Sequence, residues 1–439
     1  MKALYLVCTL ALAAALTASA QPTLASSAAP AVFNTKRFNI SDYGAVADGK
    51  TLNTAAIQRA IDTAATKGGG LIVVPKGTFM SGSIFMKRGV ELWLDEGAVL
   101  LGSPNIADYP TMKTRIEGHF PQWTPALVNF PQMDHVRVGG KGQLNGNGPI
   151  YYAAFHNAPG AKNLDVPRPR LMFVDHCTDV RIEGISFQDS GFWNLHLYNC
   201  REVVIEGLRI NAPAGSPSTD GIDVDSCQNV VIRKTQISNN DDNIALKGSK
   251  GPLANKEEAS PPVENILIED CEVGNGNGLV TCGSEATIIR NVTVRNCIIT
   301  GSAWLITLKL RPDTAQHYSN ITIDGIKLTG HANLINVAPW WHYFDLKGQS
   351  APTRVLDNIV IRNVTGAASF FGGIRGNLPN AERGTLGDTI GNFTLENFDV
   401  KLTNPAPLSR GEIANLVYKN VVINGKLVEA PPATPAPAK

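Results

Sequence analysis

The amino-acid sequence predicts an all-β protein: a single-stranded, right-handed parallel β-helix (a solenoid) with a short N-terminal capping helix. The first indication is an internal repeat. An Asn or Cys, an apolar-x-apolar pair and a Gly, Asn or Asp recur at intervals of about 23–29 residues. The second is that the repeats alternate with period two and are rich in β-branched residues, as strands are. Because no single coil can bury its apolar face, the coils must stack around one continuous core, and we predict one domain.

The chain is predicted to begin with a secretory signal peptide over residues 1–20. Lys2 precedes an apolar run from Ala3 to Leu16, and the small residues Ala18-Ser19-Ala20 precede Gln21. The apolar run is too short to span a membrane, and no other stretch of the sequence approaches the length of a spanning helix. We therefore expect an exported protein, secreted or periplasmic, in which residues 21–35 form a linker.

A short amphipathic helix is predicted between this linker and the first coil. Apolar residues in the segment from Asn53 to Ala65 recur at helical spacing: Ala56, Ile57, Ala60, Ile61 and Ala64. Such a helix would cover the open end of the β-helix, where strand edges are otherwise unpaired. The run from Gly68 to Pro75 then starts the first coil.

The following repeats define a β-helix domain, which we predict over residues 36–428. They begin at Val136, Val180, Val203, Val230, Ile266, Val292, Ile321, Ile359, Phe393 and Val421. Some also spell Asn-x-Ser/Thr, at Asn291, Asn320, Asn363 and Asn392, but we expect these Asn to be turn residues rather than glycosylation sites. Residues 429–439 form a Pro/Ala-rich tail that is predicted to be disordered.

Charge and cysteine content narrow the classes of partner. The formal net charge is +1, so nothing indicates nucleic acid or an anionic membrane as partner. Removal of the signal peptide leaves six cysteines, an even number that permits disulfides in an exported protein. However, Cys177, Cys200 and Cys227 share one repeat position, and we favour stacked free thiols in the core. No zinc-ligand spacing is present; we expect no metal, no cofactor and a monomer.

Three carboxylates are predicted to meet on the outside of two neighbouring coils. The shift that carries Ile222 onto Ile244 also carries Asp220 onto Asp242, with Asp241 beside them. Adjacent strands lie about 4.8 Å apart, so the charges would crowd and at least one pKa should rise. A protonated acid beside an ionised base is what hydrolysis of a glycosidic bond requires, whereas a lone Asp-Asp pair would be ordinary turn chemistry.

The order of four motifs resembles the polygalacturonases, the pectin-cleaving glycoside hydrolase family 28. The family's Asn-Thr-Asp, Asp-Asp, Gly-His-Gly and Arg-Ile-Lys appear as Ser218-Thr219-Asp220, Asp241-Asp242, Gly276-Asn277-Gly278 and Lys309-Leu310-Arg311. The likeness extends from about residue 36 to residue 425. It implies that Asp241 is the general acid and that Asp220 and Asp242 hold the attacking water. The implied reaction is cleavage of galacturonide bonds in a pectic polysaccharide or oligosaccharide, with inversion.

Two departures from the family pattern bear on the substrate. Asn277 stands where the family has His, and an amide can donate a hydrogen bond but cannot exchange a proton near neutrality. Strict alignment of the last motif falls on Thr307-Leu308-Lys309 and loses the Arg, whereas a two-residue shift supplies Lys309 and Arg311. On the outer face these two cations would bind substrate carboxylates, Arg311 as a bidentate fork.

Two further residues are predicted to contact the substrate. Asp223 points outward because Ile222 and Val224 point into the core. His196 lies on the same outer face one coil earlier and would contact sugar hydroxyls. The long loops 102–126, 145–170 and 250–263 interrupt the repeat and are predicted to form cleft walls.

The sequence leaves alternatives open. The missing His also fits a rhamnogalacturonan hydrolase of the same family. A Ca²⁺-dependent pectate lyase would use the same fold, with the stacked aspartates as calcium ligands and an arginine base. A non-catalytic β-helix that binds polysaccharide would need none of this chemistry. Endo versus exo action is not determined by the sequence.

Overall fold

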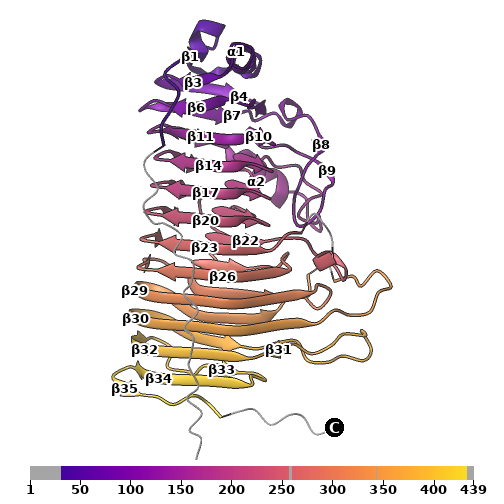
Figure 1. Ribbon diagram of the computed structural model, residues 1–439, viewed down its shortest axis with the longest axis vertical. Coiled ribbons are helices and arrows are strands. Elements are labelled where there is room, and N and C mark those ends of the chain that lie inside the picture. Colours follow the sequence, from indigo (N-terminus) through magenta and orange to yellow (C-terminus); the bar gives the residue numbers. More distant parts are fainter. Residues whose placement is uncertain (1–30, 257–259, 343, 433–439) are drawn as a thin grey trace, which may run out of the picture.

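The computed structural model describes residues 31–256, 260–342 and 344–432, which form a right-handed parallel β-helix (Figure 1). Nearly all strands belong to one parallel sheet wound into coils, so the predicted all-β solenoid is confirmed. The strands extend from Arg37 to Leu427. The predicted signal peptide (1–20), residues 21–30 of the predicted linker and residues 433–439 of the predicted tail lie outside the described residues.

Each coil contributes a strand to each wall of the helix, and the strands of one wall pair in parallel from coil to coil. We name the wall that carries the candidate site the site sheet. Its strands are β5 (Ile84–Phe85), β10 (Val128–Pro131), β13 (Met172–Asp175), β16 (Leu195–Tyr198), β19 (Ile222–Asp225), β22 (Ile244–Lys247), β25 (Val280–Cys282), β28 (Trp304–Leu310) and β33 (Ser409–Arg410).

The remaining strands form the second and third sheets. The second sheet contains β1 (Arg37–Asn39), β3 (Gly70–Val74), β6 (Val90–Leu94), β11 (Asp134–Gly140), β14 (Thr178–Glu183), β17 (Arg201–Glu206), β20 (Gln228–Arg233), β23 (Val263–Glu269), β26 (Ile288–Arg295) and β31 (Thr389–Ile390). The third contains β2 (Asp48–Leu52), β4 (Gly77–Ser81), β7 (Ala98–Gly102), β12 (Gln143–Asn145), β15 (Ser186–Gln188), β18 (Arg209–Asn211), β21 (Gln236–Ser238), β24 (Glu272–Val273) and β27 (Ile298–Ile299).

Towards the C-terminus the strands become longer and continue from one sheet into the next. These strands are β29 (Gln316–Pro339), β30 (Arg354–Ile374), β32 (Asn392–Leu402) and β34 (Asn415–Ile423). One end of β29 and of β30 extends the site sheet, because β28 pairs with the last part of β29 and that part pairs with β30. The short strand β35 (Lys426–Leu427) returns antiparallel to β34 and ends the stack.

The N-terminal end of the stack is covered by α1 (Thr54–Thr66), as predicted (Figure 1). Its buried residues are the five that recur at helical spacing: Ala56, Ile57, Ala60, Ile61 and Ala64. They pack on the Ile, Val and Leu side chains that fill the interior as one continuous core, which excludes water from the strand edges of the first coil.

The corners of the coils are stabilised by ladders of identical side chains. Asn229, Asn265, Asn291 and Asn320 have positive φ, and each amide after the first donates to the amide oxygen one coil earlier, at 2.9–3.3 Å. Asn tolerates this backbone conformation better than most residues, so the predicted turn role is confirmed for Asn291 and Asn320, and Asn363 also has positive φ. Asn392 does not, because it is the first residue of β32. The six described cysteines are buried free thiols, as favoured over disulfides.

Two long loops cross the outer side of the site sheet. The first contains η2 (Ile106–Asp108) and the hairpin β8 (Met112–Lys113) and β9 (Gln122–Trp123), and the second contains α2 (Gly148–His156). The first is fixed by Arg115, whose guanidinium donates to both carboxylate oxygens of Asp225 in β19, at 2.8 and 3.1 Å. Both side chains are 1% exposed, so this bidentate pair holds the loop against the sheet.

The described chain also has the short helices η1 (Ile40–Tyr43) and η3 (Ala254–Lys256). Within the parts of the chain that the structure covers, no helix combines the length and apolar character that crossing a membrane demands.

Candidate active site

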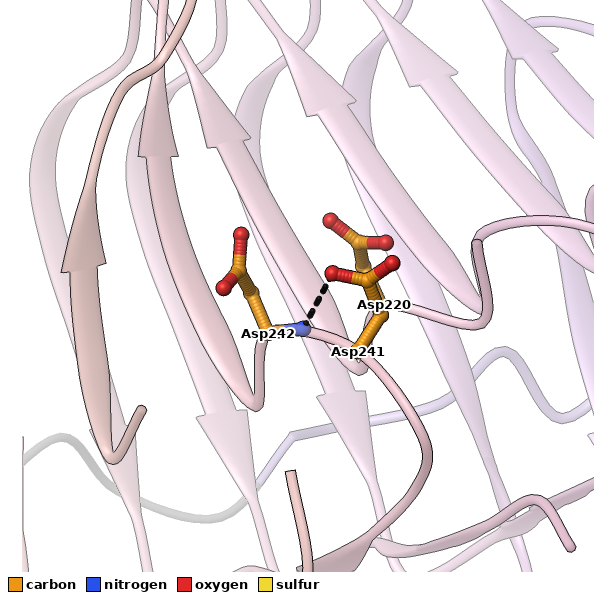
Figure 2. Close-up of side chains that lie close together, drawn as sticks. All are labelled: Asp220, Asp241 and Asp242. Atoms are coloured by element: carbon orange, nitrogen blue, oxygen red, sulfur yellow. Dashed lines mark hydrogen bonds between the residues drawn. The ribbon is translucent and has the colours of Figure 1, made fainter. Parts of the chain in front are cut away.

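Asp220, Asp241 and Asp242 converge on the outer side of the site sheet (Figure 2). Asp220 precedes β19, and the other two precede β22, the next strand of the sheet. The register pairs Ile222 with Ile244, as the sequence predicts. One oxygen of each carboxylate lies within 4.8 Å of the others, so the predicted crowding of charge is present.

Glycines allow these corners to approach closely. A Cβ on Gly221, next to Asp220, would lie 2.4 Å from the carbonyl oxygen of Asn243. Gly276 has φ +141°, and a Cβ there would lie 2.5 Å from the side-chain nitrogen of Asn243 and 2.7 Å from the Asp241 carbonyl oxygen. Larger residues at either position would push the coils apart and separate the carboxylates.

Asp241 is the carboxyl with the properties of an acid. Its Oδ1 accepts a hydrogen bond from the side-chain amide of Asn277 at 2.9 Å. It also accepts one from the backbone N–H of Asp242, at 2.9 Å (Figure 2). Burial and then the charges of Asp220 and Asp242 raise the pKa of Asp241 to about 7. Since Oδ1 accepts from two donors, a proton on this group resides on Oδ2.

Each of the other two carboxylates is paired with a lysine. Lys247 Nζ lies 3.1 Å from Asp220 Oδ2, and Lys309 Nζ lies 2.7 Å from Asp242 Oδ2. Asp242 Oδ1 also accepts from the hydroxyl of Thr281 at 2.9 Å. Because all four charged side chains are almost excluded from water, these pairs act in a low dielectric and are strong.

The lysines also face aromatic rings. Lys247 Nζ lies 4.5 Å from the ring centre of Trp193, and Lys309 Nζ lies 4.9 Å from that of Trp340. Burial disfavours each ammonium, but the neighbouring carboxylates outweigh it and raise the pKa of both lysines. Both therefore stay charged across the physiological range, and the rings fix their positions.

The carboxylates line a pocket of about 350 Å³. Its walls include Glu117 from the first long loop and Phe155 and Asn163 from the second, so these two loops form cleft walls as predicted. No described residue of the third predicted loop, 250–263, lines this pocket. At its rim, Lys250 instead pairs with Glu117 and Glu285, at 3.5 and 3.9 Å.

Of the predicted substrate-binding residues, the structure brings Asn277 and Lys309 to the carboxylates. Asn277 is exposed and donates to Asp241, and Lys309 lines the pocket. Thr307, which strict alignment places where the family motif has its Arg, lies on the same sheet. It pairs with Thr281 in β25, which in turn pairs with Ala245 in β22.

Arg311 also lines the pocket, but its predicted role as a free fork needs correction. Its Nε and Nη2 donate to the two carboxylate oxygens of Asp313, at 2.9 and 2.8 Å, and Nη1 donates to the carbonyl of His342. A substrate carboxylate therefore meets a fork that is already occupied. The arginine instead stabilises the turn that follows β28.

The predicted substrate contacts of His196 and Asp223 are corrected as well, because both side chains are fully buried. His196 accepts from Arg170 at Nδ1, 2.6 Å, which leaves Nε2–H facing Asp225 at 3.4 Å. Burial lowers the pKa of His196 to about 3. Asp223 does point out of the core, but it lies behind Asp220, 3.5 Å from Lys247, and burial followed by Asp220 raises its pKa strongly.

Sequence reasoning did not assign Lys247, Asn163 or Glu117 to the site. The signal for Lys247 was available, because alternation with the inward Ile244 and Leu246 directs it outward, in register with Asp225 of the neighbouring strand. No sequence pattern indicated Asn163 or Glu117 individually. The side-chain amide of Asn163 donates to Glu117, and its side-chain oxygen accepts from Ser218, close to Asp220. Such contacts join segments about 50 residues apart and depend on the loop conformations.

The three carboxylates also form a group that could hold a divalent cation. Yet Lys247 and Lys309 already place two positive charges against Asp220 and Asp242. A cation added between the carboxylates would meet the repulsion of both ammonium groups. The donor set therefore fits proton chemistry better than metal binding.

A carboxyl with a pKa of about 7 beside two lysine-paired carboxylates, in an open pocket on a β-helix, is the arrangement expected of a glycoside hydrolase. A family model described as "Glycosyl hydrolases family 28" matches residues 72–372, more than half of the chain. The protein belongs to this family and is a glycosidase.

Individual relatives share about a third or less of their aligned residues with this chain. A "Probable polygalacturonase" of Vitis vinifera is 33% identical over 48% of this chain, and the match spans 44% of that protein. An "Exo-poly-alpha-D-galacturonosidase" of Dickeya chrysanthemi is 28% identical over 60% of this chain and half of its own length. The crystal structure of a hyperthermoactive exopolygalacturonase from Thermotoga maritima superposes with a TM-score of 0.78 at 22% identity, covering 90% of this chain and 93% of the other.

Proposed function

We propose that this protein is an exported hydrolase that cleaves galacturonide bonds of pectin. The observation that carries the proposal is the position of Asp241, whose carboxyl lies against two carboxylates that each have their own lysine. This arrangement supports one proton donor and an ionised pair in the same pocket at near-neutral pH. The names of the relatives, which are polygalacturonases or exo-acting galacturonosidases, support a galacturonide as substrate.

In the proposed reaction Asp241 is the general acid. It transfers its Oδ2 proton to the glycosidic oxygen as the bond to the anomeric carbon breaks. Asp220 and Asp242 orient a water molecule and accept its proton as the water attacks that carbon. Lys247 and Lys309 each form an ion pair with one of these two carboxylates. Asn277 positions Asp241 through its hydrogen bond and takes no part in proton transfer.

The stereochemical outcome is a separate part of the proposal. The family resemblance implies inversion, whereas the carboxylate oxygens approach one another within 4.8 Å, closer than the roughly 6.5–9.5 Å typical of inverting enzymes. We propose inversion because three carboxylates, rather than two, share the site and two of them can hold water together. The anomer first formed, followed by NMR during the reaction, decides this point.

A rhamnogalacturonan hydrolase is the second candidate, and Asn277 favours it. The side chain lies at the acid and cannot titrate in place of His, so the surroundings of the scissile bond differ from those of the polygalacturonase pattern. With the fork of Arg311 occupied, Lys309 is the only cation of the predicted pair whose charged end is directed at the carboxylates. A backbone that alternates acidic and neutral sugars would suit a site with fewer cations.

The lyase and binding-module alternatives are less well supported. A calcium-dependent lyase needs a cation where the two lysines stand, and an arginine base where Arg311 is bound to Asp313. A module that only binds polysaccharide gives no reason to raise the pKa of Asp241 to about 7 in an open pocket.

One experiment separates these functions. Purified protein is incubated with polygalacturonate and with rhamnogalacturonan, with and without EDTA, and the products are analysed. Saturated galacturonate products that form regardless of EDTA support the hydrolase, and the preferred polymer selects between the first two candidates. Unsaturated uronides that require Ca²⁺ would establish the lyase, and binding without products the non-catalytic module.

Export and oligomeric state complete the proposal. Cleavage after Ala20 would place the enzyme in the periplasm or outside the cell, where pectic chains occur, and sequencing the N-terminus of exported protein tests it. We propose a monomer, which light scattering at micromolar concentration checks.

A further inference from the structure

A second hollow of about 490 Å³ lies on the same outer face, towards the C-terminus. Its lining includes Trp304 from β28, Asn336 from β29, and Phe370 and Arg375 at the end of β30. We call this hollow the distal groove. None of the proposed catalytic residues lines it.

Aromatic side chains form the floor and rim of the distal groove. Phe370 is 47% exposed, unlike most large apolar residues of the protein. The indole of Trp304 packs closely against the backbone of β30, since a Cβ on Gly372 would come within 2.8 Å of the ring. An indole supported in this way offers a flat apolar surface, which is suited to the apolar face of a sugar ring.

The distal groove also carries an available positive charge. Arg375 is exposed, its backbone N–H is bonded to Val337 at 2.9 Å, and no carboxylate of the described chain forms an ion pair with its guanidinium. Arg311 differs in this respect, because Asp313 occupies its fork. A planar guanidinium without a partner beside exposed aromatic rings is suited to a sugar that bears a carboxylate.

The distal groove continues directly from the candidate active site. Thr307 pairs with Thr281 on one side and with Asn336 on the other, and Asn336 pairs with Gly373. Lys309, in the active-site pocket, pairs with Ala338 in the groove. At about 4.8 Å per coil, the groove lies two to five coils, roughly 10–24 Å, from the coil of Asp242. Only a chain of several sugars can occupy both.

We propose that the distal groove is a second binding site for the acidic polysaccharide, which holds the chain beyond the sugars at the cleavage point. This inference rests on the proposed function. Trp304 and Phe370 stack on sugar rings, and Arg375 binds a galacturonate carboxylate. The site increases affinity for long chains and does not contribute to the chemical step, so its effect depends on substrate length.

The test uses Trp304→Ala, Phe370→Ala and Arg375→Gln, with Arg209→Gln as control, since Arg209 is an exposed arginine on the third sheet. Initial rates are measured on a trimer of galacturonate and on polygalacturonate. We expect each groove variant to raise KM for the polymer about 3–10-fold, with kcat/KM for the trimer and the behaviour of the control unchanged. Binding to polymer gels, with each change combined with Asp241→Asn to prevent digestion, should weaken in parallel.

Two comparisons separate the ring contacts from the charge. On carboxyl-reduced polymer Arg375→Gln should bind like its parent, whereas the two aromatic variants should still bind more weakly. Raising the salt concentration should remove the Arg375 effect first. Equal polymer KM and binding in all variants, with trimer cleavage intact, would overturn the distal site and leave the proposed function standing. Failure of the unmodified protein to cleave or bind any galacturonan would overturn both.

Discussion

Lys309 and Asp242 lie two coils apart along the site sheet, and the lysine Nζ donates to Asp242 Oδ2 at 2.7 Å. Asp242 is 1% exposed, so without this partner it would be a buried carboxylate with no paired cation, which is costly. The pair connects the motif that ends β28 to the motif that begins β22. It thereby supports the proposal that Asp242 is one of the two bases.

The first prediction follows from this pair. Lys309→Met should lower kcat strongly and move the acidic limb of the pH–rate profile to higher pH, because the charge of Lys309 lowers the pKa of Asp220 and this effect is lost with the ammonium. Lys309→Arg should restore part of the rate. The profile of kcat/KM is the measurement, and a reduced rate with no movement of the limb would assign Lys309 to substrate binding alone.

Asp241→Asn should reduce turnover by about 10²–10⁴, the usual contribution of a general acid. The fold should be retained: the folded state holds the pKa of Asp241 at about 7, above its usual 3.8, so this group costs stability as pH rises through that interval. Thermal unfolding above pH 7 should therefore show a variant at least as stable as the wild type. Near-normal rates would remove Asp241 from the mechanism.

The wild-type pH–rate profile should be bell-shaped. The basic limb should fall as pH rises through about 7, when Asp241 loses its proton. The acidic limb should lie above the ordinary carboxyl range, because burial raises the pKa of Asp220 despite Lys247 and its ionised form is required. A rate that stays constant well above neutrality would contradict the assigned acid.

Lys247→Met should destabilise the protein by about 3–5 kcal/mol, because it leaves the buried Asp220 and Asp223 without their cation. Lys87→Met is the matched control. It breaks an ion pair of 2.7 Å whose side chains are about half exposed, which should cost at most about 1 kcal/mol. Urea unfolding measures both, and equal effects would show that the burial of Lys247 is unimportant.

Arg311→Gln should affect acidic and carboxyl-reduced substrates alike, because Asp313 rather than the substrate occupies its fork. The expected change is a loss of stability, larger than that of Arg362→Gln, whose pair with Asp324 is half exposed. Parallel assays on the two substrates give the answer. A defect confined to the acidic substrate would instead show that Arg311 binds a substrate carboxylate.

The sequence by itself determined the coil and the stacking of the carboxylates. Period-two alternation and a repeat of near-constant length leave one way to bury every apolar face, so the register that places Ile222 on Ile244 follows from the pattern. The same register brings Asp220 beside Asp241 and Asp242. The helix over the first coil was equally predictable, since its apolar residues recur at the spacing of one face of an α-helix.

Only the tertiary structure decided which outward residues face the pocket and which are covered. Alternation correctly directs His196 and Asp223 out of the core, yet both are buried. Arg170, at the end of the second long loop, and Trp193 pack against His196, and Asp220 and Lys247 lie against Asp223. The fork of Arg311 turns to Asp313, two residues away, and Lys247 joins the site because Trp193 and two carboxylates surround it. A strand pattern specifies the direction of a side chain; the loops that pack on it, which have no period, determine whether solvent or substrate reaches it.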